Sequence, residues 1–145
     1  MVSRTSSSGS GGQDFAFSIS GGLLLATFNL DDDTDLTLPN TQTFNNVAAG
    51  TYTVNQAQTT AFEESIVCSD PDGGTSVDAL PTASGINAAI DLDPGETITC
   101  TFTNTKRPTL TLVKQVINDN GGSAGPNDFG ISQNGVVNLS GSTIS

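Results

Sequence analysis

The sequence has no His, no Trp, a single Tyr and only four Lys or Arg residues in a length of 145. His is the commonest general base and the commonest transition-metal ligand, so its absence argues against Ser-His-Asp, Cys-His and zinc hydrolase chemistry. The four cations face 15 Asp and Glu residues, and the net charge of −11 repels nucleic acid and anionic membranes. We therefore predict that the protein is not an enzyme and that nucleic acid is not its partner.

Long apolar runs are missing as well. No stretch approaches the ~18 apolar residues of a membrane-spanning helix, so no membrane span is predicted. Apolar residues make up 34% of the chain, and Thr, Ser, Asn, Asp and Gly fill much of the rest, a composition typical of thin, turn-rich β structure. The Ser- and Gly-rich start of the chain favours a flexible linker over residues 1–12.

Alternating apolar and polar residues predict short strands from residue 13 onward. In residues 13–20 the apolar residues Phe15, Phe17 and Ile19 share one face. Turn-forming residues separate this segment from similar ones at 23–30, 51–56, 62–69, 86–92 and 97–105. No segment shows a sustained apolar period of 3.6 residues, so essentially no helix is expected beyond a turn. The pattern predicts an all-β protein whose residues 13–107 form an antiparallel β-sandwich.

The C-terminal part of the sequence repeats the opening of this domain. After Lys106-Arg107-Pro108, residues 109–118 (TLTLVKQVIN) predict a new strand, and residues 126–132 (PNDFGIS) align with residues 12–18 (GQDFAFS). Residues 108–145 therefore begin a second unit that they do not complete. Such a segment belongs to a following repeat or is donated as a strand to a neighbouring molecule.

Three predicted strands each carry a polar residue where an apolar one is expected. Two-residue alternation places Asn104, Gln56 and Lys114 on the apolar faces of their strands. A buried amide or ammonium group needs a hydrogen-bond partner. We therefore expect these three side chains to converge in one polar cluster.

Several segments resemble a known family. LTLVKQVINDNGG, AAGTYTVNQ and PGETITCTFTNTK are similar to the prealbumin-like repeat domains (Cna B-type, SpaA-like) of bacterial surface adhesins and pilins. The resemblance implies an immunoglobulin-like or prealbumin-like sandwich. In that family the Lys-bearing strand comes first and the Asn-bearing strand last. It therefore implies that residues 13–107 lack their own first strand and that residues 109–118 are the first strand of the next unit.

The resemblance also implies a chemistry for the polar cluster. Family members often join the first-strand Lys to the last-strand Asn by an isopeptide bond, with a Glu as the proton shuttle. The corresponding residues here are Lys114 and Asn104, while Gln56 stands at the Glu position. Gln cannot take up or return a proton at neutral pH, which favours a hydrogen-bonded Lys–Asn–Gln cluster over the isopeptide bond. Both alternatives stay open at this point.

Cys68 and Cys100 are the only cysteines of the chain. An even pair in a polar, Lys-poor sequence favours one disulfide formed in an oxidising compartment, with two free buried thiols as the alternative. The family resemblance supports the disulfide, since both cysteines lie in strand contexts typical of such repeats. We therefore expect an extracellular, cell-surface protein.

Two acidic loops offer hard oxygen ligands of the kind that calcium prefers. One holds Asp31, Asp33 and Asp35, and the other holds Asp70, Asp72 and Asp78. Neither loop has the terminal Glu of the EF-hand pattern. Solvated acidic turns that protect sheet edges are the alternative interpretation, and no cofactor other than calcium is predicted.

These features predict a structural module of a bacterial surface protein, stalk or filament that assembles head to tail with copies of itself. Two forms fit: part of a tandem-repeat array, and a filament subunit whose residues 109–145 complete a neighbour as a donor strand. The alternative function is an adhesive binding module with calcium-stabilised acidic loops. The lack of Trp and the single Tyr leave such a module little surface for stacking on sugars.

Overall fold

Two compact units make up the chain. The computed structural model describes residues 2–6, 13–31, 37–133, 136–138 and 143–144. Its internal contacts divide the chain into Met1–Arg107, here called unit 1, and Pro108–Ser145, here called unit 2. The boundary falls within the Lys-Arg-Pro sequence that follows the last Thr-rich strand of unit 1.

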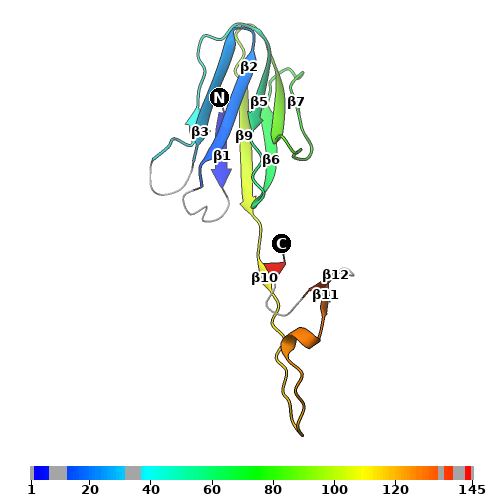
Figure 1. Cartoon of the computed structure of the whole chain (residues 1–145). Helices are drawn as coiled ribbons and strands as arrows, with labels where there is room; N and C mark the ends of the chain where they lie inside the picture. Colours follow the sequence, from blue (N-terminus) through cyan, green and yellow to red (C-terminus); the bar gives the residue numbers. More distant parts are fainter. Residues whose placement is uncertain (1, 7–12, 32–36, 134–135, 139–142, 145) are drawn as a thin grey trace. The chain divides into compact units, whose positions relative to one another are not determined.

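Unit 1 is a sandwich of two β-sheets (Figure 1). One sheet has the strand order β3-β2-β5-β8-β7 and the other the order β4-β1-β9-β6. The strands are β1 (Val2–Ser6), β2 (Phe15–Gly21), β3 (Leu24–Leu30), β4 (Thr41–Gln42), β5 (Gly50–Gln56), β6 (Phe62–Ser69), β7 (Ser76–Val77), β8 (Ile86–Leu92) and β9 (Thr99–Lys106). All neighbouring strands are antiparallel except β1 and β9, which are parallel. The predicted all-β sandwich is confirmed.

The apolar faces of the two sheets pack against each other to form the core. In β2 the side chains of Phe15, Phe17 and Ile19 are buried, as their alternation predicts. Aromatic rings meet edge to face between the sheets, with Phe17 and Phe102 centroids 5.0 Å apart. Burying a side chain of this size contributes about 1.5–3 kcal/mol. Two-residue alternation is therefore the local signal that decides which face of each strand enters the core.

The first strand of the sandwich comes from the N-terminal segment, which corrects two predictions. Residues 1–12 were expected to be a flexible linker, yet Val2–Ser6 form β1, paired with β9 on one side and β4 on the other. Residues 13–107 were expected to lack a first strand, and β1 fills that position. Backbone hydrogen bonds to β9 order a segment whose own composition favours disorder. Residues 7–12 of the predicted linker lie outside the described residues.

The parallel pairing of β1 and β9 gives unit 1 two different ends. Both strands start at the end that carries the β2–β3 hairpin and the 93–96 turn, which we call the amino-terminal pole. β9 finishes at Lys106 at the opposite end, the carboxyl-terminal pole. Figure 1 shows the chain leaving the sandwich there.

Unit 2 contains only short elements. They are β10 (Leu110–Thr111) paired with β13 (Thr143–Ile144), β11 (Ile131–Gln133) paired with β12 (Val136–Asn138), and a 3-10 turn at Pro126–Asp128. That turn is the only helical segment among the described residues, as expected. The strand predicted over residues 109–118 is limited to Leu110–Thr111, because a strand needs a neighbouring backbone and only these residues have one.

Candidate functional site

A disulfide joins the neighbouring strands β6 and β9. Cys68 and Cys100 are directly opposite each other in this ladder, with their Cα atoms 4.0 Å apart, and their sulfur atoms are bonded. The Cys100 side chain is 1% exposed. The predicted pairing is confirmed, and the alternative of two free thiols is excluded.

Gln56 and Asn104 form a buried amide pair that connects the two sheets. Gln56 ends β5, Asn104 lies in β9, and both side chains are 0% exposed. Gln56 Nε2 donates to Asn104 Oδ1 at 2.7 Å, and Asn104 Nδ2 donates to Gln56 Oε1 at 3.0 Å. These two hydrogen bonds offset much of the free-energy cost of removing two amides from water. Two members of the predicted polar cluster therefore do meet in the core.

Glu64 is a further buried polar residue that sequence analysis did not single out. It lies opposite Asn104 in the β6–β9 ladder and is 8% exposed. Its Oε1 accepts hydrogen bonds from the Thr59 backbone N–H at 2.7 Å and the Thr59 hydroxyl at 2.8 Å. Its Oε2 has no hydrogen-bond partner in the described part of the chain. The sequence did indicate that Glu64 is buried, because alternation puts it between Phe62 and Ile66 on the buried face of β6.

Lys114 is the third residue of the predicted polar cluster, and its meeting with Gln56 and Asn104 stays a prediction. It belongs to unit 2, where its Nζ lies 3.8 Å from the centroid of the Phe129 ring in a cation–π contact. β9 lies between β6 and β1, and on the β1 side the residue in register with Asn104 is Ser6. The place that the resemblance assigned to a Lys-bearing strand is therefore held by the N-terminal strand of the same unit.

A group of carboxylates lies at the amino-terminal pole. Oxygen atoms of Asp70, Asp72 and Glu96 lie within 4.8 Å of one another. The Asp70 carboxylate is held by its own loop, since it accepts hydrogen bonds from the backbone N–H groups of Gly73 and Thr75, each at 2.9 Å. Asp70 and Asp72 were predicted to belong to one set of calcium ligands. The 93–96 turn places Glu96 beside them, which was not predicted.

The pKa values of these carboxyl groups shift in opposite directions. Hydrogen bonds, first of all from Thr75, hold the pKa of Asp70 well below its ordinary value of 3.8. A side-chain hydrogen bond with Asp72, together with repulsion from it, raises the pKa of Asp93. The pKa of Glu96 is also raised, because loss of water contact and the nearby Asp70 and Asp72 outweigh the lowering effect of the Asp93 backbone N–H. Negative charge is therefore crowded at this pole.

Asp78 and Asp31, two other predicted calcium ligands, are not part of this group. Asp78 Oδ2 accepts hydrogen bonds from the Asn87 backbone N–H at 3.0 Å and from Asn87 Nδ2 at 2.8 Å. Asp31 is 2% exposed, and its backbone N–H donates to the Pro39 carbonyl at 3.0 Å. Asp33 and Asp35 lie outside the described residues. The predicted set of Asp70, Asp72 and Asp78 is corrected, because the loop pairs Asp78 with β8 instead.

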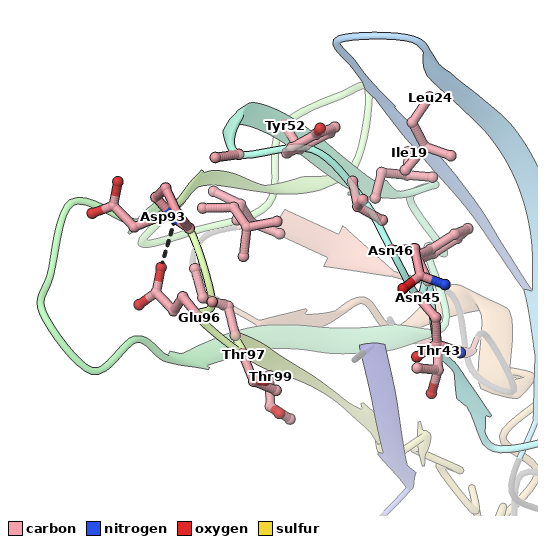
Figure 2. Close-up of a pocket in the computed structure, with 18 residues that line it drawn as sticks. Ile19, Leu24, Thr43, Asn45, Asn46, Tyr52, Asp93, Glu96, Thr97 and Thr99 are labelled. Atoms are coloured by element: carbon pink, nitrogen blue, oxygen red, sulfur yellow. Dashed lines mark hydrogen bonds between the residues drawn. The ribbon is translucent and has the colours of Figure 1, made fainter.

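A cavity of about 600 Å³ opens between the sheets at the amino-terminal pole. Figure 2 shows Ile19, Leu24 and Tyr52 along one side of it, with Asp93 and Glu96 on a turn at its edge. The Tyr52 hydroxyl donates to the Ala48 carbonyl at 2.6 Å and so holds the loop that forms another wall. The apolar residues that line the cavity are Ile19, Leu24, Phe44, Val47, Ala49, Tyr52, Ile90, Leu92, Pro94 and Ile98.

Comparison with family models covers the entire chain. A model described as a prealbumin-like fold domain, of the SpaA type, matches residues 1–106. The chain belongs to this family. A second SpaA-type model with the same description matches residues 106–145. No curated protein and no solved structure matches the chain.

Membership in the prealbumin-like family agrees with the sandwich and with the resemblance seen in the sequence. Domains of this type are typical of bacterial surface proteins and are usually structural modules without catalytic activity. The Cys68–Cys100 disulfide of this prealbumin-like domain is consistent with a place outside the cytosol. In the described ranges, no helix is long and apolar enough to cross a membrane.

Proposed function

We propose that this prealbumin-like domain is a structural unit of an extracellular bacterial surface protein, a stalk or filament in which similar units follow one another head to tail. The observation that carries the proposal is the point where the two family matches meet, at residue 106, the last residue of β9. One match ends where the next begins, with no linker between them. Abutting domains of one family are the signature of a tandem arrangement.

The direction of the strands supports a linear arrangement of units. β1 and β9 run the same way, so the chain passes through unit 1 from its amino-terminal pole to its carboxyl-terminal pole. The eight residues of β9 span about 23 Å between these poles. Units connected at opposite poles extend the assembly rather than fold it back on itself.

The same pairing suits the unit to resist tension. Force applied through the two ends pulls β1 toward one pole and its neighbour β9 toward the other. The backbone hydrogen bonds along five residue pairs are then sheared together instead of breaking one after another. The Cys68–Cys100 disulfide also prevents β9 from sliding past β6.

The position of β1 supports the tandem-array form over the donor-strand form. The edge of β9 that a donated strand would occupy already carries β1. Residues 1–107 expressed alone should therefore unfold cooperatively, with a Tm close to that of the full chain, and a peptide of residues 109–118 should not raise it. A fragment that folds only when the peptide is added would instead support donor-strand assembly.

Single-molecule pulling tests the mechanical role. Because the disulfide keeps 32 residues closed at up to ~3.5 Å each, unfolding under oxidising conditions should release about 110 Å less chain than under reducing conditions. Handles at Glu63 and Arg107 provide the control, since they unzip β6 from β9 from one pole. The proposal requires a higher unfolding force through the two ends than through these control handles. An equal or lower force would refute it.

A further inference from the structure

The cavity at the amino-terminal pole is apolar inside and acidic at its edge. Ile19 and Ile90 from one sheet face Ile98 from the segment leading into β9, and the volume of about 600 Å³ is within the roughly 300–1,000 Å³ of ligand sites. Asp93 and Glu96 are the only charged residues among those that line it in the described part of the chain. Such a cavity is complementary to an occupant that is both apolar and positively charged.

Neighbouring carboxylates strengthen the negative field at the cavity edge. Asp70 and Asp72 lie beside Glu96, with their oxygen atoms within 4.8 Å of one another. Repulsion from Asp72, Asp91 and Asp70 contributes to the raised pKa of Asp93. A cation bound at this edge would relieve that repulsion.

The chain contains one segment with matching chemistry. Three of its four cations lie in residues 106–114, and no carboxylate occurs between residues 106 and 118. We call residues 106–113 (KRPTLTLV) the exit segment. Its Leu110 and Val113 are 51% and 76% exposed, so they are accessible to a partner. Lys106 and Arg107 are exposed as well.

The cations at the start of the exit segment cannot reach the cavity of their own unit. Thr99 lines the cavity, and Lys106 lies at the other end of β9, about 23 Å away. An exit segment that places these cations at the cavity must therefore come from another molecule. Such a contact joins two different surfaces, so it can continue from one molecule to the next without closing.

We propose that the cavity at the amino-terminal pole binds the exit segment of a second copy of this chain. Lys106 and Arg107 of that copy lie against Asp93 and Glu96, and Leu110 enters the apolar interior. The inference rests on the proposed head-to-tail assembly and identifies the two surfaces through which separate molecules join.

The fluorescence of Tyr52 reports directly on the cavity, because it is the only Tyr and the chain has no Trp. We expect a saturable change when the full chain is titrated with a peptide of residues 106–113. Binding should weaken at least tenfold in the cavity variant, Asp93→Lys with Glu96→Lys, and with a peptide carrying Ser at positions 106 and 107. If the Ser peptide binds as tightly as the unchanged peptide, the cavity takes an uncharged apolar occupant and the proposal is overturned. The absence of saturable binding by the unchanged peptide would also overturn it.

Sedimentation velocity on the whole chain tests association between copies. The wild-type chain should associate as its concentration rises, and less so in about 0.5 M salt, which screens exposed charges. The cavity variant and an exit variant, Lys106→Glu with Arg107→Glu, should each be monomeric alone and associate when mixed. A control with the same charge change elsewhere, Asp14→Lys with Asp119→Lys, should behave as wild type, and circular dichroism confirms that every variant is folded.

Two outcomes would overturn the docking contact. One is a mixture of the two variants that fails to associate, and the other is a control that loses association as fully as the cavity variant. A wild-type chain that stays monomeric at every concentration would also overturn it. A monomeric wild-type chain would not contradict the proposed tandem arrangement, because the pulling experiment tests the covalently linked units independently.

Discussion

The buried amide pair offers a sharp test of what holds the two sheets together. Gln56 and Asn104 exchange two hydrogen bonds and have no exposed surface. Asn104→Leu would leave a donor and an acceptor of Gln56 buried without partners, at a cost of ~1–3 kcal/mol for each group. We expect this variant to lose about 2–5 kcal/mol, a large part of the ~5–15 kcal/mol that stabilises a small domain. Gln56→Met should have a similar effect on Asn104.

Changing both residues should remove most of the penalty. The double variant, Gln56→Met with Asn104→Leu, replaces two polar groups by apolar groups of similar size, and its stability should be within about 1 kcal/mol of wild type. The coupling free energy between the two sites is then at least ~2 kcal/mol. Urea unfolding under oxidising conditions, extrapolated to water, measures all four proteins.

An amide pair on the outer face of the sheet provides the matched control. Asn55 Nδ2 donates to Asn87 Oδ1 at 2.8 Å, and both residues are half-buried, so water can replace either partner. Asn55→Ala should therefore cost no more than about 1 kcal/mol. Additive losses in the Gln56 and Asn104 series, or single variants no worse than this control, would refute the view that the buried pair depends on mutual hydrogen bonding.

Three further predictions concern the disulfide, the acidic pole and calcium. Replacing Cys68 and Cys100 by Ala should cost about 3–4 kcal/mol, because the bond closes a loop with a sequence separation of 32; equal urea midpoints for the variant and the oxidised wild type would contradict this. The folded-state pKa of Asp93 is raised, so the contribution of Asp93 to stability falls as pH rises above 3.8 toward neutrality. The folded-state pKa of Asp70 is lowered, so the contribution of Asp70 to stability is lost as pH falls below 3.8. Calorimetry from about pH 3 to 8 should show Asp93→Asn raising Tm at pH 7 and Asp70→Asn lowering it, and the opposite signs would exclude this assignment. Calcium should raise Tm no more than magnesium at equal concentration, because the Asp70 carboxylate already accepts backbone hydrogen bonds; a calcium-specific rise would instead support the adhesive module.

Strand positions in unit 1 could be predicted closely because they depend on a local property. The predicted strands at 51–56 and 62–69 agree with β5 and β6 to within a residue. The burial of Phe17 and Phe102 follows from alternation alone. β1 was missed for the opposite reason: Val2–Ser6 carry little apolar character, and their partner β9 lies about a hundred residues further along the chain. No local sequence pattern predicts the pairing of β1 with β9.

The candidate sites divide in the same way. The meeting of Gln56 and Asn104 was predictable because both continue an apolar face. Glu64 carried the same signal and was overlooked. Lys114 was assigned to the cluster through the order of strands in the family, and the structure places β1 beside β9, where the family order puts the Lys-bearing strand. The partnership of Asp70 with Glu96 depends on two turns that come together only in the folded sandwich.

The sequence by itself determined which faces of the strands are buried, the Cys68–Cys100 pairing, the acidic surface and the family, since each depends on residue type, spacing or composition. The tertiary structure decided which segment fills the first-strand position, which carboxylates gather, and that an apolar cavity opens at the amino-terminal pole. Those features arise from contacts between segments far apart in the chain. A period of two residues specifies a face, whereas the choice of neighbouring strand depends on backbone hydrogen bonds, which are the same for almost every residue type.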